Sequence, residues 1–263
     1  MRKILLLSTI FVFVLGFGFV HGEGKKKTFP LPDYVLDISK DNTYPNPTQD
    51  LPRLVPSELT EQLLKSASVK IENPELIRLL NESSITNAKS APLLRASIYL
   101  GEWPLSYESK ETTVNWEYQK VNTNFLDNRG GKEAKRLYYV QEQQKKVTGG
   151  LTAQLPRGED VKKMMLMKAM ERTGLPLAFE TVIGYGTKKD QVYNVSPKNV
   201  GYLYSFVPAA NEKGKVTYGE VYLIIKGGKP KLEIKNVTQQ GIGAWIPVQD
   251  HLSFQFHTGK HPR

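Results

Sequence analysis

The spacing of apolar residues along the chain predicts three helices. Ser57 can cap the first helix, and Asn73 with Pro74 begins the second, since a short polar side chain followed by proline favours a helix start. The third helix spans residues 161–173 and ends at Gly174, a residue that readily adopts the left-handed conformation that follows helices. The first two helices carry the apolar residues Leu59, Leu63, Leu64, Leu76, Ile77, Leu79 and Leu80. Such apolar faces are typical of helices that pack on a core.

Alternation of apolar and polar residues predicts β-strands in the rest of the chain. The clearest alternation, at residues 113–121, indicates a half-buried antiparallel strand. Gly227 and Gly228 fit the two-residue turn of a hairpin over residues 221–234. Further strands are predicted at residues 91–100, 136–147, 178–183, 191–195, 201–207, 216–225, 231–237 and 251–257. The pattern therefore predicts an α+β fold, a mostly antiparallel β-sheet with a few helices packed on one face.

The N-terminus has the pattern of a secretory signal peptide at residues 1–22. Arg2 and Lys3 precede an uncharged run over residues 4–20, and small residues suit cleavage after Gly22. An uncleaved membrane anchor is the alternative, because the apolar run is at the short end of what spans a bilayer. In either case we expect the protein to be secreted or associated with the cell envelope, outside the cytoplasmic membrane.

The chain after the signal peptide divides into an arm, a domain and a tail. Residues 23–56 hold six prolines, each of which disfavours helix. Apolar residues between the prolines distinguish this segment from a plain linker, so we expect an extended Pro-rich arm packed on the domain. The α+β domain is predicted at residues 57–258, and residues 259–263 form a flexible tail.

The composition restricts the chemistry that the protein can use. Its 263 residues include no cysteine, which excludes disulfides, thiolate zinc sites, iron–sulfur clusters and cysteine nucleophiles. The formal net charge is +10; loss of Arg2 and Lys3 leaves 34 basic against 26 acidic residues, a net charge of +8. The sequence predicts no cofactor and no metal.

Four lysines flank the predicted hairpin turn: Lys226, Lys229, Lys231 and Lys235. Together with the positive net charge, they indicate attraction to an anionic wall polymer or to lipid headgroups. Nucleic acid is the usual partner of such charge, but the expected export argues against it. The alternative is that these lysines serve only solubility.

Candidates for chemistry are few. His251, His257 and His261 lie in the last thirteen residues, and in a strand the first two imidazoles are about 20 Å apart, too far for one zinc ion. Glu180 lies among apolar strand residues and is the acid best suited to a semi-apolar catalytic site; a solvent-facing position is the alternative. The methionine-rich helix at residues 161–173 suits either burial in the core or an adaptable partner contact.

A family resemblance rests on two segments, N-T-Y-P-N-P-T-Q-D-L-P-R-L at residues 42–54 and G-I-G-A-W-I-P-V-Q-D-H at residues 241–251. Both resemble the YfkD-like family of exported proteins from Bacillus and its relatives. Neither segment contains a chemical motif. The resemblance implies export from a spore-forming Gram-positive bacterium and a role in envelope or spore biology, and it implies no catalytic residue.

These observations predict an exported, non-enzymatic, envelope-associated protein that binds an anionic wall polymer, a membrane surface or another exported protein. The alternative is a carboxylate-dependent hydrolase of cell-wall or spore components, with Glu180 as its catalytic acid. A third possibility is an inhibitor or chaperone of another exported protein that uses the methionine-rich helix.

Overall fold

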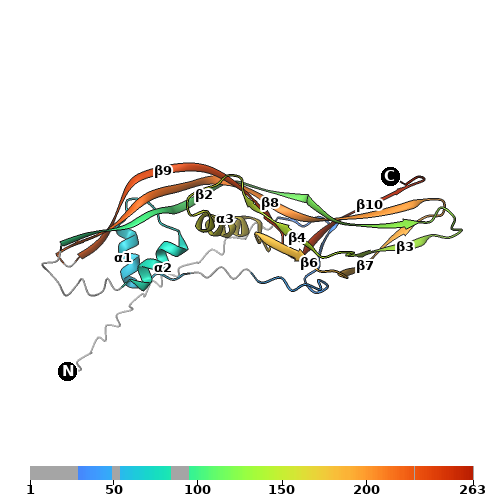
Figure 1. Cartoon of the computed structure of the whole chain (residues 1–263), viewed down its shortest axis with the longest axis horizontal. Coiled ribbons are helices and arrows are strands. Elements are labelled where there is room, and N and C mark those ends of the chain that lie inside the picture. The colour runs from blue at the N-terminus through green and yellow to red at the C-terminus, as the bar shows by residue number, and fades with distance from the viewer. Residues whose placement is uncertain (1–28, 49–53, 84–94, 228, 263) are drawn as a thin grey trace, which may run out of the picture.

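The structure, a computed structural model, describes residues 29–48, 54–83, 95–227 and 229–262. The predicted signal peptide at residues 1–22 lies outside the described residues. The molecule is elongated, and its long axis follows the long strands of one sheet (Figure 1). The elements in chain order are β1 (Val35–Asp37), α1 (Glu58–Ser66), α2 (Pro74–Glu82), β2 (Arg95–Asp127), β3 (Lys135–Val140), β4 (Lys145–Thr148), β5 (Gly150–Leu151), α3 (Gly158–Thr173), β6 (Glu180–Ile183), β7 (Lys188–Val195), β8 (Val200–Lys226), β9 (Lys229–Pro247) and β10 (His251–Gly259).

A six-stranded antiparallel sheet forms the frame of the molecule. Its central strand, β8, pairs along one edge with β2 and along the other with β9 and β10. The short strands β1 and β5 extend the sheet beside β10 and β9. Two further sheets have two strands each, β3 with β7 and β4 with β6. The predicted α+β class with a mostly antiparallel sheet is confirmed.

Several strands have different lengths from those predicted. Residues 201–207 and 216–225 belong to one strand, β8, and residues 113–121 are only the middle of β2. The prediction of separate strands is wrong because residues 209–215 remain paired on both sides, with β2 and with β9. The single strand predicted at residues 136–147 is also wrong, since β3 and β4 pair with different partners.

Gly214 explains how the polar part of β8 stays in the sheet. A Cβ atom at this position would collide with the backbone oxygen of Glu108 and with the ring of Tyr107, both on β2. The glycine therefore permits a close approach of the two strands, a common reason for glycine inside a strand.

The local signals for helix ends and for the hairpin are confirmed. Ser57 Oγ accepts a hydrogen bond from the backbone N–H of Thr60 at 3.2 Å and caps α1, and Asn73 caps α2 in the same way. Gly174 ends α3 with a φ of 69°. The hairpin between β8 and β9 has a two-residue turn in which Gly227 has a φ of 60°.

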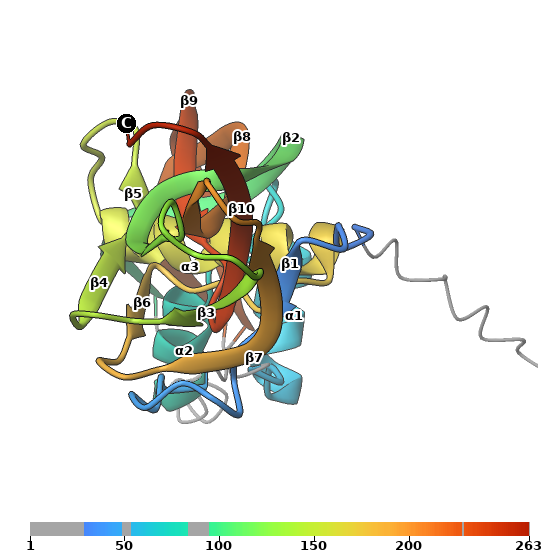
Figure 2. The ribbon, with the colours of Figure 1, turned by 90° about the vertical axis from the view of Figure 1, so that its right-hand side faces the viewer.

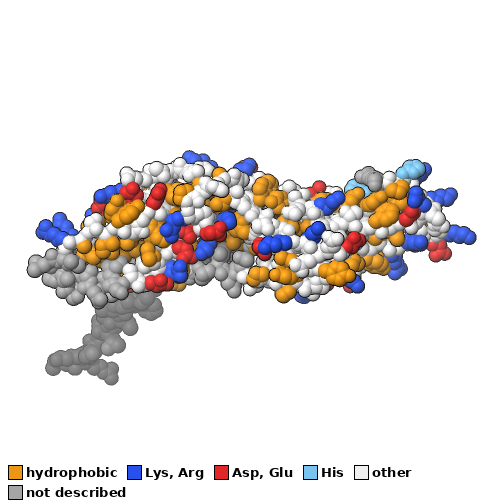
Figure 3. Space-filling view, viewed as in Figure 1, with side chains coloured by type: hydrophobic (Ala, Val, Ile, Leu, Met, Phe, Trp, Pro, Cys, Tyr) orange, Lys and Arg blue, Asp and Glu red, His pale blue; other side chains and the backbone are white. Residues whose placement is uncertain are grey.

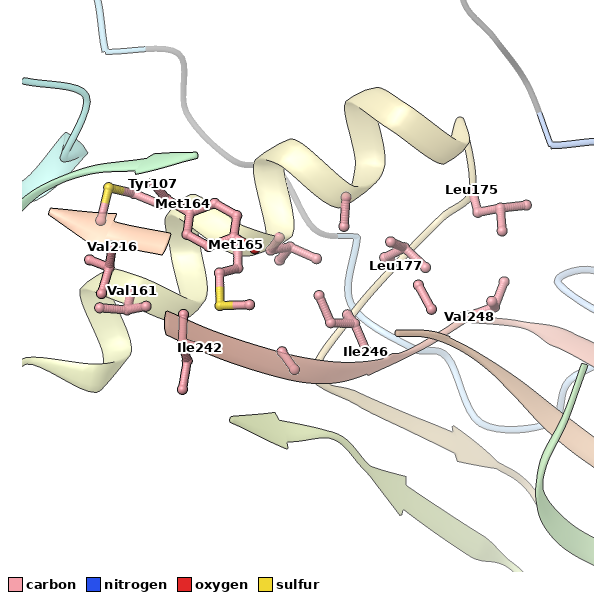
Figure 4. Packing of buried hydrophobic residues seen from close by; sticks show 14 of the residues in the cluster. Tyr107, Val161, Met164, Met165, Leu175, Leu177, Val216, Ile242, Ile246 and Val248 are labelled. Atoms are coloured by element: carbon pink, nitrogen blue, oxygen red, sulfur yellow. The ribbon is translucent and has the colours of Figure 1, made fainter. Parts of the chain in front are cut away.

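The helices lie on one side of the long strands (Figures 1 and 2). On that side they cover two clusters of buried apolar residues. α1 and α2 cover the hairpin end, with Leu63, Leu76 and Leu223 in the core. α3 covers the centre, where Met165 and Ala169 are fully buried (Figure 4). A third cluster packs β3, β7 and β10 against the other end of β8. The core interpretation of the methionine-rich helix is therefore confirmed.

Two asparagines fasten the Pro-rich arm to the sheet. Asn42 and Asn46 each donate an amide N–H to Oδ1 of Asp250, at 2.8 and 2.7 Å. Both amides also donate to the backbone oxygen of Val182, and their own oxygens accept from backbone N–H groups of Gly184 and Val182. We call Asn42, Asn46 and Asp250 the arm clasp. The clasp joins the segments 42–54 and 241–251, which are distant in sequence.

Candidate functional site

The four predicted lysines gather on one face of the β8–β9 hairpin. Lys226 and Lys229 pair directly across the turn. Alternate residues of a strand point to the same side, so Lys229, Lys231 and Lys235 share this face. Arg95, at the start of β2, pairs with Lys226 from the other edge. We call Arg95, Lys226, Lys229, Lys231 and Lys235 the basic face.

Acidic side chains neutralise only the part of the basic face that is farther from the turn. Glu233 lies 4.0 Å from Lys231 and 3.4 Å from Lys235. Within the described part of the chain, Arg95, Lys226 and Lys229 form no ion pair, and Lys226 and Lys229 are exposed. Basic side chains are visible at this end in Figure 3. The turn therefore presents concentrated positive charge to solvent.

Two tyrosines lie beside these cations. The rings of Tyr99 and Tyr222 are 5.0 Å apart, and Tyr99 is 56% exposed. The ammonium group of Lys235 lies 4.8 Å from the centre of the Tyr222 ring. A phenol ring combines an apolar body with a polar tip, so this surface offers apolar contact as well as charge.

Glu180 occupies a solvent-facing position at the start of β6. Its carboxylate lies 2.6 Å from the ammonium group of Lys146 on the neighbouring strand, and half of its side chain is exposed. The structure thus shows the alternative arrangement for this residue rather than a semi-apolar site.

Sequence reasoning missed a carboxylate that is fully buried, Glu212 of β8. It accepts hydrogen bonds from the hydroxyls of Tyr107 at 2.9 Å and Thr112 at 2.5 Å. Burial, and then the adjacent carboxylate, raise the pKa of Tyr107 well above its usual value. The sequence around Glu212, N-E-K-G-K, resembles a polar turn, and it contains no local signal for burial.

A cleft of about 730 Å³ lies near this pair, between α3 and β2. Tyr107 lines it, whereas Glu212 does not. Glu72 lies close to Lys70 and 3.6 Å from Lys168, so much of the charge in the cleft is paired. The cleft therefore lacks the single sign of charge that the basic face has.

The histidines do not combine into a metal site. His251 is buried in β10, and its Nδ1–H donates to the backbone oxygen of Gln249 at 2.8 Å, whereas His257 is exposed on the same strand. No group of three or more His, Asp or Glu side chains in the described ranges could hold a metal ion. Among the helices of the described residues, none combines the length and the hydrophobicity that a membrane span requires.

Comparison with known proteins gives three findings. A family model described as YfkD-like protein matches residues 32–263. The "Uncharacterized protein YfkD" of Bacillus subtilis (strain 168) is 59% identical over 265 residues, an alignment that covers 100% of both chains. Among solved structures, the Lamprey immune protein aligns over 64% of this chain and 54% of its own, with 6% identity and a TM-score of 0.26. That structural similarity is too low to support an argument.

Proposed function

The chain belongs to the YfkD-like protein family, and from the structure of this member we propose that it is a non-enzymatic envelope protein that binds phosphate-rich polyanions through its basic face. The predicted signal peptide supports a location outside the cytoplasmic membrane. There the phosphate groups belong either to anionic wall polymers or to lipid headgroups. We extend the proposal to a role in the envelope or spore of a bacterium such as Bacillus subtilis, the source of the uncharacterised relative.

The proposal rests on the three cations at the turn that have no acidic partner among the described residues. Arg95, Lys226 and Lys229 lie at adjacent strand ends, so a single anionic chain or surface can contact all of them. Each cation near an anionic surface contributes about 1 kcal/mol, so the three together account for roughly a hundredfold in affinity. Because these groups are exposed, salt screens the attraction strongly.

Reversing the charge at the turn should abolish this binding. We expect the variant K226E/K229E/K231E to bind anionic surfaces at least about a hundredfold more weakly than the natural protein. The measurement is cosedimentation, at about 0.05 M and about 0.5 M salt, with phosphatidylglycerol-containing vesicles and with purified cell walls. Walls stripped of their phosphate polymers distinguish the two sources of phosphate.

A matched control carries the same change of net charge at the other end of the molecule. Lys132, Lys135 and Lys188 are exposed and form no ion pair with a described residue. Replacing all three with glutamate should leave binding nearly unchanged. Equal losses in the two variants would attribute binding to net charge and refute the role of the basic face. Release of wall fragments would instead support the hydrolase, and binding only to a protein component of the wall would support a protein partner.

A further inference from the structure

A groove lies beside the turn of the β8–β9 hairpin, where the end of β8 pairs with the start of β2. Its volume is about 300 Å³, and its lining residues are Arg95, Ala96, Ser97, Ile224, Ile225 and Lys226. The two cations face each other across the strands, and the apolar residues follow directly behind them. We call these six residues the tip groove.

Exposed apolar side chains continue from the tip groove along β2. Ile98 is 44% exposed and Tyr99 is 56% exposed. Within the described residues β2 pairs only with β8, so its outer edge has no neighbouring strand at this point. Figure 3 shows hydrophobic side chains next to basic ones at this end of the molecule. The edge of β2 therefore presents apolar surface directly beside the basic face.

We propose that this edge docks on a membrane surface that contains anionic phospholipid. The proposal rests on the function proposed for the basic face and narrows its two phosphate sources to one. Arg95 and Lys226, which have no acidic partner among the described residues, meet the lipid phosphates, while their aliphatic stems lie along apolar surface. Ile98 and the ring of Tyr99 enter the boundary between headgroups and acyl chains, where an aromatic ring with a polar tip is favoured.

The apolar lining of the tip groove selects a lipid rather than a wall polymer. A chain of phosphates and hydroxyl-bearing carbons has no apolar segment that could cover Ala96, Ile98 and Ile224, so its contacts would be limited to the cations. A phospholipid supplies phosphate and acyl chain together, in the same order as the cations and the apolar residues of this edge.

Acidic side chains farther along the strands limit the contact to residues 95–99. Glu102 is exposed and pairs with Glu220 of β8. An anionic membrane repels these carboxylates. At about 3.3 Å per residue, Glu102 lies roughly 20 Å from Arg95 along β2. The membrane contact is therefore short and is confined to the hairpin end of this long molecule.

A fluorophore in the tip groove tests the docking directly. The chain contains no cysteine, so Ser97→Cys accepts an environment-sensitive label at a single exposed position. On vesicles that contain phosphatidylglycerol, we expect the emission of the label to shift to the blue and to be quenched by lipids with a nitroxide on the acyl chain. Vesicles of phosphatidylcholine alone should cause neither change. The matched control is the same label at Thr113→Cys, an exposed position farther along β2, which should not respond.

The readout is local, so contact of another part of the chain with the vesicle does not produce it. A label at position 97 that remains in water while the protein is bound to phosphatidylglycerol vesicles would overturn the proposal and leave the role of the basic face intact. An equal response on phosphatidylcholine vesicles would also overturn it, because the cations would then have no part in the docking.

Removal of the exposed apolar side chains separates lipid from other phosphate ligands. The variant I98S/Y99S should bind phosphatidylglycerol vesicles about tenfold more weakly than the natural protein. It should bind soluble inorganic polyphosphate unchanged, because that polyanion has no apolar part. The charge-reversal variant K226E/K229E/K231E should lose both ligands.

The chain offers a matched control for the apolar substitutions. Tyr185 and Val192 are 71% and 42% exposed on the β6–β7 segment, away from the hairpin. The variant Y185S/V192S should bind vesicles as the natural protein does. Vesicle binding that survives in I98S/Y99S, or that falls equally in both double variants, would overturn the docking proposal. A natural protein that binds walls and polyphosphate but no vesicles would refute this proposal alone, whereas one that binds none of the three would refute the proposed function as well.

Discussion

Replacing Asp250 with alanine is expected to lower the free energy of unfolding by about 4 kcal/mol. The substitution removes an ionised acceptor from two amide donors, those of Asn42 and Asn46. A hydrogen bond to a charged group contributes about 1.5–3 kcal/mol. In addition, Asp250 has a φ of 52°, a left-handed conformation that alanine adopts less readily than aspartate. Urea unfolding of the two proteins measures the difference.

Two further substitutions separate these contributions. Asp250→Asn keeps an oxygen acceptor and a residue that tolerates the left-handed conformation, so it should cost much less than alanine. Asp250→Gly removes the acceptor but relieves the backbone, so its cost should fall between the two. If alanine proves no more destabilising than asparagine, the two hydrogen bonds to the Asp250 side chain contribute little. The arm is then held by its other hydrogen bonds, to Val182 and Gly184, and by its strand pairing with β10.

The arm clasp shows the structural role of the two segments that resemble the YfkD-like family, residues 42–54 and 241–251. Asn42 and Asn46 lie in one segment and Asp250 in the other. They come into contact because β1 of the arm pairs with β10, and Asp250 directly precedes β10. Gln249 also donates its side-chain amide to the backbone oxygen of Pro47 at 2.8 Å. The described parts of the two segments therefore build the structure, and the candidate binding surfaces lie elsewhere.

The features that local sequence predicts correctly depend on neighbouring residues. Ser57, Asn73 and Gly174 mark helix ends because their contacts lie within four residues, and the hairpin follows from its turn. Its register then aligns Lys226 with Lys229, so the basic face follows from the sequence once the turn is known.

The features that local sequence does not predict depend on distant partners. Glu212 is buried because Tyr107, 105 residues away, donates to it. The position of Phe125 and His257 beside Tyr202 escapes prediction for the same reason, since strand pairing alone brings them together. Alternation within β8 indicates that Tyr202 and Tyr204 share a face, but it does not distinguish an open surface from a covered one.

Alkaline pH should destabilise the fold steeply, because three buried tyrosines are kept neutral in it. Tyr107, Tyr139 and Tyr218 are at most 4% exposed, and burial is the first cause that raises the pKa of each, to about 12 for Tyr218. In the unfolded chain these phenols ionise near pH 10. A raised pKa in the folded state means that the stabilisation is complete below about pH 10 and is lost as pH rises toward the folded value.

Each such tyrosine should reduce the free energy of unfolding by about 1.4 kcal/mol per pH unit above pH 10. The three together should give a slope of about 4 kcal/mol per pH unit. Urea unfolding at a series of pH values up to 12 measures the slope. Other groups titrate in the same range, so the comparison with Tyr218→Phe isolates one phenol. This variant loses the hydrogen bond to the Pro156 oxygen at every pH. Its free energy of unfolding should fall with pH about a third less steeply than that of the natural protein. Parallel slopes for the two proteins would show that Tyr218 ionises in the folded state, and the burial argument would then fail for this residue.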